Sequence, residues 1–368
     1  MSSKKMSKKK IQKILRPDME YVHMGQMKVD ESKCKKCEVC FAMENCPFRA
    51  WELGSDGIPV MKKIHECFSC FNCLAACPNN AIQMIATYHV DEGYFKTEPH
   101  PLPYKAPLEP KDEEGNPTEY TAIEKTVLNR RSVRNFRFDK PVPEHLIQRI
   151  LEAGRFAPSS GNCQPWKFIV VTDKALIKEM DDAAAKYIEF LYNAYMNDES
   201  VDSLAPIIQM MSPGLFDPRI VLGGLGTIVK NNPHISGPID EWLENMKEKG
   251  QGDKMYPYAL VSLVAPVIIL IVGDVRSIPT IEMNIGICGQ NMNLVANSLG
   301  LGACWNGFIA RFVNVTALRN KFGIKKNWNI LTALCIGYPR FKQEGMVPRE
   351  YRPVTWFREG KEGPEIQE

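Results

Sequence analysis

The chain has 368 residues, of which 44% are hydrophobic and 24% are charged, as in soluble globular proteins with a large core. This length favours two or more domains over one. The formal net charge of +3 gives no strong field that would indicate nucleic-acid binding. The longest apolar run, residues 265–273, is far shorter than the ~18 residues of a membrane-spanning helix. No apolar signal segment follows the first lysines, so we expect a cytoplasmic protein.

Residues 1–28 are predicted to form a basic, flexible arm. The default interpretation is a solvated, disordered segment, and the alternative is a docking arm for an acidic partner or a membrane surface. Its basic residues all precede the first acidic residue, Asp18; they are Lys4, Lys5, Lys8, Lys9, Lys10, Lys13 and Arg16.

Residues 29–95 contain eight of the twelve cysteines of the chain. Two Cys-x2-Cys-x2-Cys runs are each followed by a Cys-Pro pair, which is the ligand pattern of cubane iron–sulfur clusters. Structural zinc is the alternative, but four-coordinate zinc does not use a third equally spaced cysteine. Regular spacing in a long chain without a signal segment also indicates free thiols in a reducing compartment rather than disulfides. The eight are Cys34, Cys37, Cys40, Cys46, Cys67, Cys70, Cys73 and Cys77.

This module strongly resembles the bacterial two-[4Fe-4S] ferredoxin family. The resemblance implies two clusters, each taking its fourth ligand from the other half. One cluster would be bound by Cys34, Cys37, Cys40 and Cys77, and the other by Cys67, Cys70, Cys73 and Cys46. The halves repeat, because residues 46–51 align with residues 77–82. The spacer of residues 41–45 is two residues longer than its counterpart and departs from the family pattern.

A proline-rich linker is predicted over residues 96–120, because its prolines exclude a helix or a central strand. Residues 121–368 then alternate helical and strand patterns, interrupted by an irregular insertion over 197–257. The fold class is therefore α+β, with the cysteine module followed by an α+β sandwich domain. Helices are expected at 121–130, from 143, and at 174–195, 280–299 and 315–322, and strands at 166–172, 266–274, 301–308 and 331–337.

Three stretches of the second domain have the chemistry of a cofactor site. The first, residues 130–136, has three arginines and a hydroxyl that suit a phosphate, although a solvated basic surface is the default for such a stretch. The second, residues 157–166, has small hydroxyl and amide side chains before a buried strand. The third, residues 299–308, is rich in glycine but enters a strand, so it is not a dinucleotide-binding turn. We expect Cys163, Cys288, Cys304 and Cys335 to be core residues.

Together, in this order, the three stretches resemble the nitroreductase family of FMN-dependent oxidoreductases, and so does the IGYPR segment at 336–340. The resemblance implies a homodimer that binds FMN at the subunit interface. The first stretch would contact the phosphate and the pyrimidine side of FMN, the second would reach it from the partner subunit, and the third would lie near its reactive nitrogen. The implied cofactor-binding residues are Arg130, Arg131, Ser132, Arg134, Pro158, Ser159, Ser160, Asn162, Asn306, Gly307 and, in preference to Arg349, Arg352.

The two resemblances together predict an oxidoreductase in which two [4Fe-4S] clusters pass electrons to FMN for two-electron reduction of an organic acceptor. An external ferredoxin, another low-potential donor or NAD(P)H would supply the electrons. The alternatives are reductive dehalogenation, cofactor-modifying flavin chemistry, or a non-catalytic electron-transfer or redox-sensing subunit. No residue is singled out as the proton donor; by residue type alone the candidates are His234, Tyr192, Tyr195, Tyr256 and Tyr258.

Overall fold

A computed structural model describes two compact units, one within Arg130–Lys342 and the other formed by Tyr21–Asn129 with Gln343–Glu368. Each unit is described by itself below. The described residues are 22–46, 50–62, 67–91, 96, 99, 107–137, 139–184, 265–277, 280–307, 309, 313, 316–341, 345–349 and 352–367. The predicted insertion at 197–257 lies outside this part of the chain, as do the first 21 residues of the predicted arm.

The unit within Arg130–Lys342 is built on a four-stranded sheet in which all neighbours are antiparallel. The strand order is β7 (Trp166–Val171), β8 (Val267–Asp274), β10 (Trp328–Gly337) and β9 (Gly302–Trp305). Because β8 lies in the middle, its apolar residues are buried along both faces of the sheet. The strands predicted from sequence are all present, and β10 begins three residues earlier than expected.

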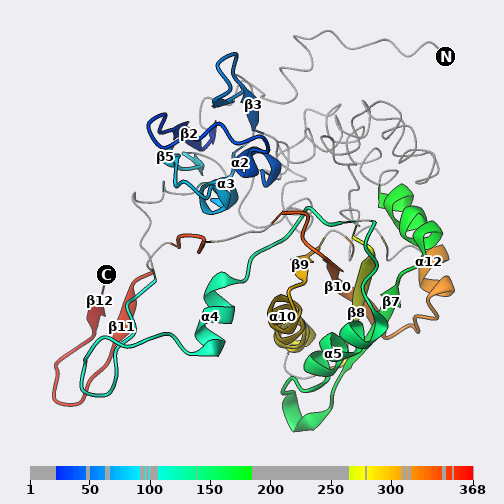
Figure 1. Cartoon of the computed structure of the whole chain (residues 1–368). Helices are drawn as coiled ribbons and strands as arrows, with labels where there is room; N and C mark the ends of the chain where they lie inside the picture. The colour runs from blue at the N-terminus through cyan, green and yellow to red at the C-terminus, as the bar shows by residue number, and fades with distance from the viewer. Residues whose placement is uncertain are drawn as a thin grey trace. The chain divides into compact units, whose positions relative to one another are not determined.

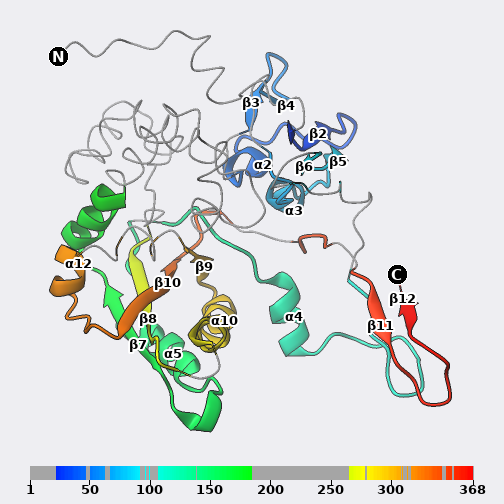
Figure 2. The same ribbon diagram turned by 180° about the vertical axis from the view of Figure 1, so that it is seen from behind.

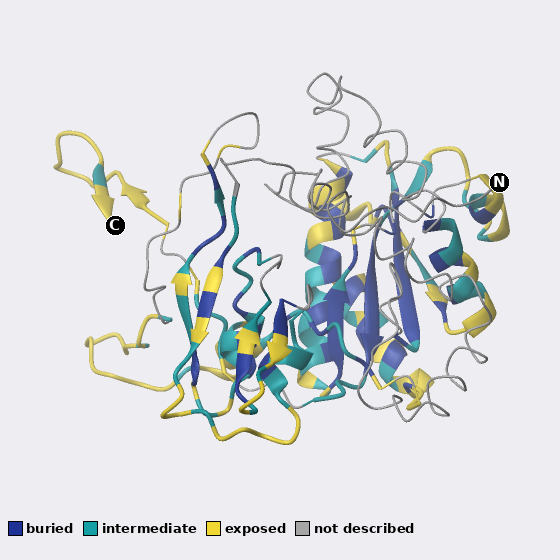
Figure 3. Cartoon of the chain, turned by 90° about the horizontal axis from the view of Figure 1, so that it is seen from above, coloured by how far each residue is buried: buried dark blue, intermediate teal, exposed yellow. Residues whose placement is uncertain are grey.

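Helices cover both faces of this sheet (Figure 1, Figure 2). Helices α5 (Glu144–Arg155) and α10 (Ile281–Ser298) pack on the face to which Ile269 and Ile271 point. The helix that includes residues 174–184 and α12 (Thr316–Lys321) cover the other face. Successive residues of β8 thus enter opposite cores, as the two-residue period of a strand requires. Figure 3 shows the resulting buried central strands.

The unit with the cysteines consists of two interleaved halves. The first half contains β2 (Gln26–Val29), the short helix α2 (Phe41–Glu44) and β3 (Trp51–Leu53). The second contains β4 (Pro59–Met61), α3 (Asn72–Ala76) and β5 (Ile82–Ala86). The opening strand of each half pairs with the closing strand of the other, β2 with β5 and β4 with β3. The internal repeat expected from the sequence is therefore also a structural repeat.

Residues 22–28, which we expected to belong to the flexible arm, instead begin this unit. They include β1 (Val22–His23), which pairs with β6 (His89–Val90), and most of β2. Met27 is buried in the core of the unit, where it contributes apolar area alongside Trp51. The strands were missed because each is short and pairs with a segment about sixty residues further along the chain.

Two segments on either side of the four-stranded sheet unit in the sequence, those up to Asn129 and from Gln343 onward, also group with the cysteine unit. Helix α4 (Ala122–Asn129) falls in the predicted second domain and has no buried residue. The C-terminal residues form a hairpin of β11 (Val354–Trp356) and β12 (Glu365–Gln367), which we did not predict. Within the described part of the chain, no helix is both long and apolar enough to cross a membrane.

Candidate functional site

The first group of thiols consists of the first cysteine run and Cys77, which comes from the other half of the module. Burial raises the pKa of the Cys40 thiol, and the neighbouring thiols of Cys77 and Cys34 raise it further. Cys37 is exposed and accepts a hydrogen bond from the Asn79 side chain at 3.7 Å, two residues beyond Cys77. The loop after the second run therefore lies against the first run.

The second group has the reciprocal composition. Burial raises the pKa of Cys67 to about 12, and the thiols of Cys70 and Cys46 add to the rise. Burial also raises the pKa of Cys73, and the neighbouring thiols of Cys46, Cys70 and Cys67 raise it further. The structure therefore brings Cys46 to the second run, in the crossed arrangement that the ferredoxin resemblance implies.

Cys46 and Cys77, the two cysteines that join the run of the other half, each accept an equivalent backbone hydrogen bond. The amide of Ala50 donates to the Cys46 sulfur at 3.3 Å, and the amide of Ala81 donates to the Cys77 sulfur at 3.4 Å. Both donors lie four residues after the cysteine, so the repeat extends to the atoms around the sulfurs. Such N–H···S bonds stabilise negative charge on a ligand sulfur and tune the potential of a cluster.

The raised pKa values bear on what these groups can hold. A thiol whose pKa lies well above neutrality keeps its proton unless a cation displaces it. Each group of four neighbouring cysteines provides such a place for iron; the first includes one exposed cysteine and the second one buried cysteine, and the others are of intermediate burial. By count two zinc sites of four cysteines each would also fit, but no three of these sulfurs in the described part of the chain lie within 4.8 Å of one another, whereas sulfurs ~2.3 Å from a tetrahedral zinc are about 3.8 Å apart.

The first and third stretches of the other unit lie side by side. Ser132 forms an isolated parallel bridge with Ala303 of β9, and the Val133 amide donates to the Ala303 carbonyl at 3.0 Å. A Cβ on Gly302 would lie 2.7 Å from the Val133 side chain, so this approach requires glycine. The sequence predicted both stretches separately, and the sheet edge joins them.

The extended backbone of the first stretch divides its side chains between two faces. Arg130, Ser132 and Arg134 are partly exposed, whereas Arg131 and Val133 are buried. Burial lowers the pKa of Arg131, and the charge of Arg130 lowers it further. This two-residue alternation separates Arg131 from the three residues that could contact a ligand together.

The third stretch ends in one buried and one exposed residue. The Asn306 amide donates to the Ala333 carbonyl of β10 at 2.9 Å, and the residue is 5% exposed. Gly307 is exposed, and an added Cβ would meet nothing within 4 Å. Burial raises the pKa of Cys304, which the charges of Arg134 and Arg130 lower, so both guanidinium groups lie near this strand.

The second stretch lies at the other edge of the sheet. Residues 160–162 form a 3-10 turn just before β7, and Ser159 accepts a hydrogen bond from the Gln164 amide at 3.0 Å. Pro158, Ser160 and Asn162 are exposed. Strands β8 and β10 separate β7 from β9, which puts the two edges roughly 14 Å apart at ~4.8 Å per strand. One chain alone therefore does not bring the second stretch next to the other two.

The remaining sequence predictions have mixed outcomes. Arg352 and Arg349 are exposed and belong to the unit with the cysteines, so they are described apart from the three stretches. Cys288, Cys304 and Cys335 are buried as expected, but Cys163 is exposed because it lies in the turn before β7 rather than in a strand or helix. The five proton-donor candidates lie outside the described residues.

Sequence reasoning missed a cluster of two histidines and an aspartate, His23, His89 and Asp91. The signal that could have found it is the His-x-Asp spacing at 89–91, because residues two apart on a strand share a face. The third member is brought by a strand pairing across 66 residues of sequence.

Fold and sites together define a class of protein: a redox protein that joins a module with two tetrads of cysteines to a helix-covered antiparallel sheet. Residues 26–78 match the family described as "4Fe-4S dicluster domain". Residues 127–338, more than half of the chain, match the family described as "Nitroreductase family". The chain belongs to the nitroreductase family and carries an N-terminal 4Fe-4S dicluster domain.

Individual relatives are more distant. A "Putative NADH dehydrogenase/NAD(P)H nitroreductase" of Archaeoglobus fulgidus is 24% identical over 221 residues, which cover 60% of this chain and 87% of the relative. An iodotyrosine deiodinase of Haliscomenobacter hydrossis is 32% identical over 113 residues, 30% of this chain and 49% of the relative. A solved nitroreductase with bound FMN from Desulfitobacterium hafniense covers 65% of this chain and 100% of its own, at 20% identity and a TM-score of 0.41.

Proposed function

We propose that this protein is an iron–sulfur flavoprotein oxidoreductase that reduces an organic acceptor by two electrons. The observation that supports it most directly is that two crossed tetrads of cysteines occur in the same chain as a nitroreductase-family domain. When bound, the two [4Fe-4S] clusters supply single electrons and FMN combines two of them for the acceptor.

The residues that would hold FMN follow from the exposed side of the first stretch. Arg130 and Arg134 offer guanidinium groups that form charge-assisted bonds to a phosphate and stabilise negative charge near the flavin ring. Ser132 adds a hydroxyl between them, and Asn306 directly follows the neighbouring strand β9. The absence of a side chain at Gly302 allows this arrangement.

A homodimer completes the site in this proposal. The turn that contains Pro158, Ser159, Ser160 and Asn162 is exposed at the far edge of the sheet, so the turn of a second copy has to supply the contacts that the chain's own turn does not reach. Arg352 remains the proposed late contact to the phosphate.

The electron donor is proposed to be an external ferredoxin or another low-potential iron–sulfur protein, and the acceptor a nitro group or an activated C=C bond. NAD(P)H is the alternative donor. A second function, reductive dehalogenation, is favoured by the similarity to the iodotyrosine deiodinase. Aryl halides and nitroaromatics supplied in parallel to the reduced enzyme distinguish the two.

The test is anaerobic purification followed by iron, sulfide and flavin analysis and by reduction with NADH, NADPH and reduced ferredoxin in turn. We expect about eight irons and one FMN per chain, and flavin reduction by ferredoxin that requires the clusters. Zinc in place of iron would overturn the iron–sulfur assignment. Fast reduction of the flavin by NADH in protein that lacks the clusters would overturn the ferredoxin route.

A further inference from the structure

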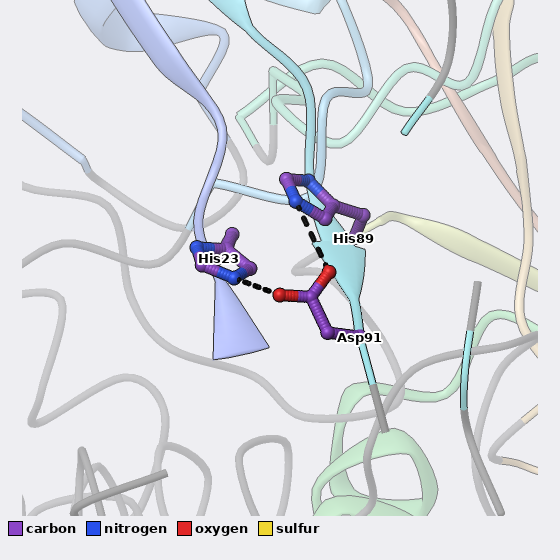
Figure 4. A group of neighbouring side chains, drawn as sticks. All are labelled: His23, His89 and Asp91. Carbon is purple, nitrogen blue, oxygen red and sulfur yellow. Dashed lines mark hydrogen bonds and ion pairs between the residues drawn. The ribbon is translucent and has the colours of Figure 1, made fainter. Parts of the chain in front are cut away.

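The three side chains of the His23 cluster converge from two paired strands (Figure 4). His23 of β1 and His89 of β6 are direct cross-strand partners, and Asp91 follows on the same face as His89. The Nε2 atom of His23 lies 2.6 Å from Asp91 Oδ2, and that of His89 lies 3.6 Å from Asp91 Oδ1. The two imidazole rings are nearly parallel, with centroids 4.3 Å apart.

A backbone contact fixes which nitrogen of His89 faces the cluster. Its Nδ1 lies 3.0 Å from the Thr87 carbonyl, which can only accept a hydrogen bond, so Nδ1 carries the proton. In neutral His89 the lone pair of Nε2 then points toward a carboxylate. A histidine that binds a metal through one ring nitrogen usually donates the N–H of the other to a backbone carbonyl or a carboxylate, and the Thr87 carbonyl takes this role for His89.

The donor set selects the kind of ion. Two imidazole nitrogens and one carboxylate suit a borderline divalent ion such as Zn²⁺, whereas Ca²⁺ and Mg²⁺ prefer oxygen ligands alone. Ligands ~2.1 Å from a tetrahedral ion are about 3.4 Å apart. The distance of 3.6 Å between His89 and Asp91 is close to this separation, whereas His23 and Asp91 form a direct hydrogen bond of 2.6 Å and have to move about 0.8 Å apart to admit the ion. The side chains are 42%, 20% and 52% exposed in the order His23, His89 and Asp91, so an ion and a water ligand have access.

We propose that His23, His89 and Asp91 form a binding site for one divalent ion of the zinc type, separate from the eight cluster cysteines. The ion would join β1 to β6, the strands that precede and follow the two halves of the cysteine module. Water completes the coordination, because three protein ligands leave a fourth position open.

This site is connected to the loop of the second cysteine group. Two residues beyond His23, the Gly25 amide donates to the Cys67 carbonyl at 2.8 Å. One residue before His89, the Tyr88 amide donates to the Ser69 hydroxyl at 2.8 Å. An ion that holds β1 and β6 together therefore also holds both strands against the Cys67 loop.

The experiment uses the purified protein with its iron, sulfide and flavin in place, dialysed to equilibrium against increasing Zn²⁺. We expect one additional zinc per chain with no loss of iron. His89→Gln and Asp91→Asn should each weaken this binding at least ~tenfold. His145→Gln is the matched control, since this exposed histidine lies on α5 in the other unit.

Hydrogen exchange supplies a second measurement that does not depend on activity. Zinc should slow exchange of the Gly25 and Tyr88 amides in the wild type and in His145→Gln, but not in Asp91→Asn, whose side chain has the same shape as aspartate. The proposal is overturned if the wild type takes up no zinc, or if the two ligand variants bind zinc as tightly as the control.

Discussion

A single hydrogen bond to sulfur is predicted to contribute to a difference in reduction potential between the clusters of the two cysteine groups. The Asn79 side chain of the second half donates to the Cys37 sulfur of the first half at 3.7 Å. An Asn79→Leu variant removes a donor that stabilises negative charge on this sulfur, so the reduction potential of the first cluster should fall. Redox titration followed by electron paramagnetic resonance measures this, with the second cluster as internal control. An equal shift in both clusters would contradict the assignment.

Arginines in and next to the first stretch are predicted to differ in how much they contribute to FMN binding. Arg134 is on the partly exposed side near β9, whereas Arg137 is exposed and pairs with Asp139 at 3.0 Å. Arg134→Gln should weaken FMN binding about tenfold or more, because it removes a charge-assisted bond. Flavin fluorescence during equilibrium dialysis measures the affinity. Arg137→Gln is the matched control, and equal flavin loss in both variants would refute the role of Arg134.

At the scale of elements, the stability of helix α4 is predicted to depend on its N-terminal cap. The Thr121 amide and hydroxyl both donate to a Glu124 carboxylate oxygen at 2.7 Å, and the Glu124 amide donates back to the hydroxyl at 3.3 Å. This is a capping box, and it matters here because the helix has no buried residue. Thr121→Val should increase hydrogen exchange over residues 122–129 several-fold, about the effect of a lost N-cap.

The same cap predicts a pH dependence for α4. The hydrogen bonds from the Thr121 hydroxyl and backbone lower the pKa of Glu124 below its usual 4.5. Since the folded pKa is the lower one, the cap stabilises the helix above pH 4.5, and this contribution is lost as the pH falls through the folded value. The protection of the α4 amides, which is their slowing relative to the unstructured exchange rate at the same pH, should fall over that interval in the wild type. The fall should be smaller in Thr121→Val, which loses the hydroxyl bonds but keeps the backbone bond to Glu124, and an equally large fall there would show that the cap is not its cause.

The elements show which parts of the fold the sequence could predict. Helix α10 was expected at 280–299 and spans Ile281–Ser298, because its apolar period is long and uninterrupted. Pro143 correctly marked the beginning of α5. The β11–β12 hairpin and the β1–β6 pair escaped prediction because two or three residues carry too little pattern. The cluster of His23 and Asp91 escaped for the same reason, since only tertiary pairing assembles it.

At the scale of the whole molecule, the basic arm is predicted to act on the donor rather than on the fold. Removing residues 1–16 should raise the Michaelis constant for reduced ferredoxin several-fold at low salt, because ferredoxins are usually acidic and the arm adds attraction. The difference should vanish near 1 M salt, where the screening length is about 3 Å. The Michaelis constant for the organic acceptor is the control and should not change. An unchanged Michaelis constant for ferredoxin at low salt would mean that the arm is a solvated tail without a role in docking the donor.

The bridge between Ser132 and β9 has a consequence for solubility. Strand β9 is the edge of its sheet, and an uncovered edge strand is a template for pairing with another molecule. The segment that carries Arg130, Ser132 and Arg134, which are proposed to bind FMN, also covers this edge, through the hydrogen bond from the Val133 amide to the Ala303 carbonyl. Loss of flavin that loosens this segment would expose the edge, so flavin-depleted protein should aggregate sooner than loaded protein. Retention of cofactor and resistance to aggregation then depend on the same short segment.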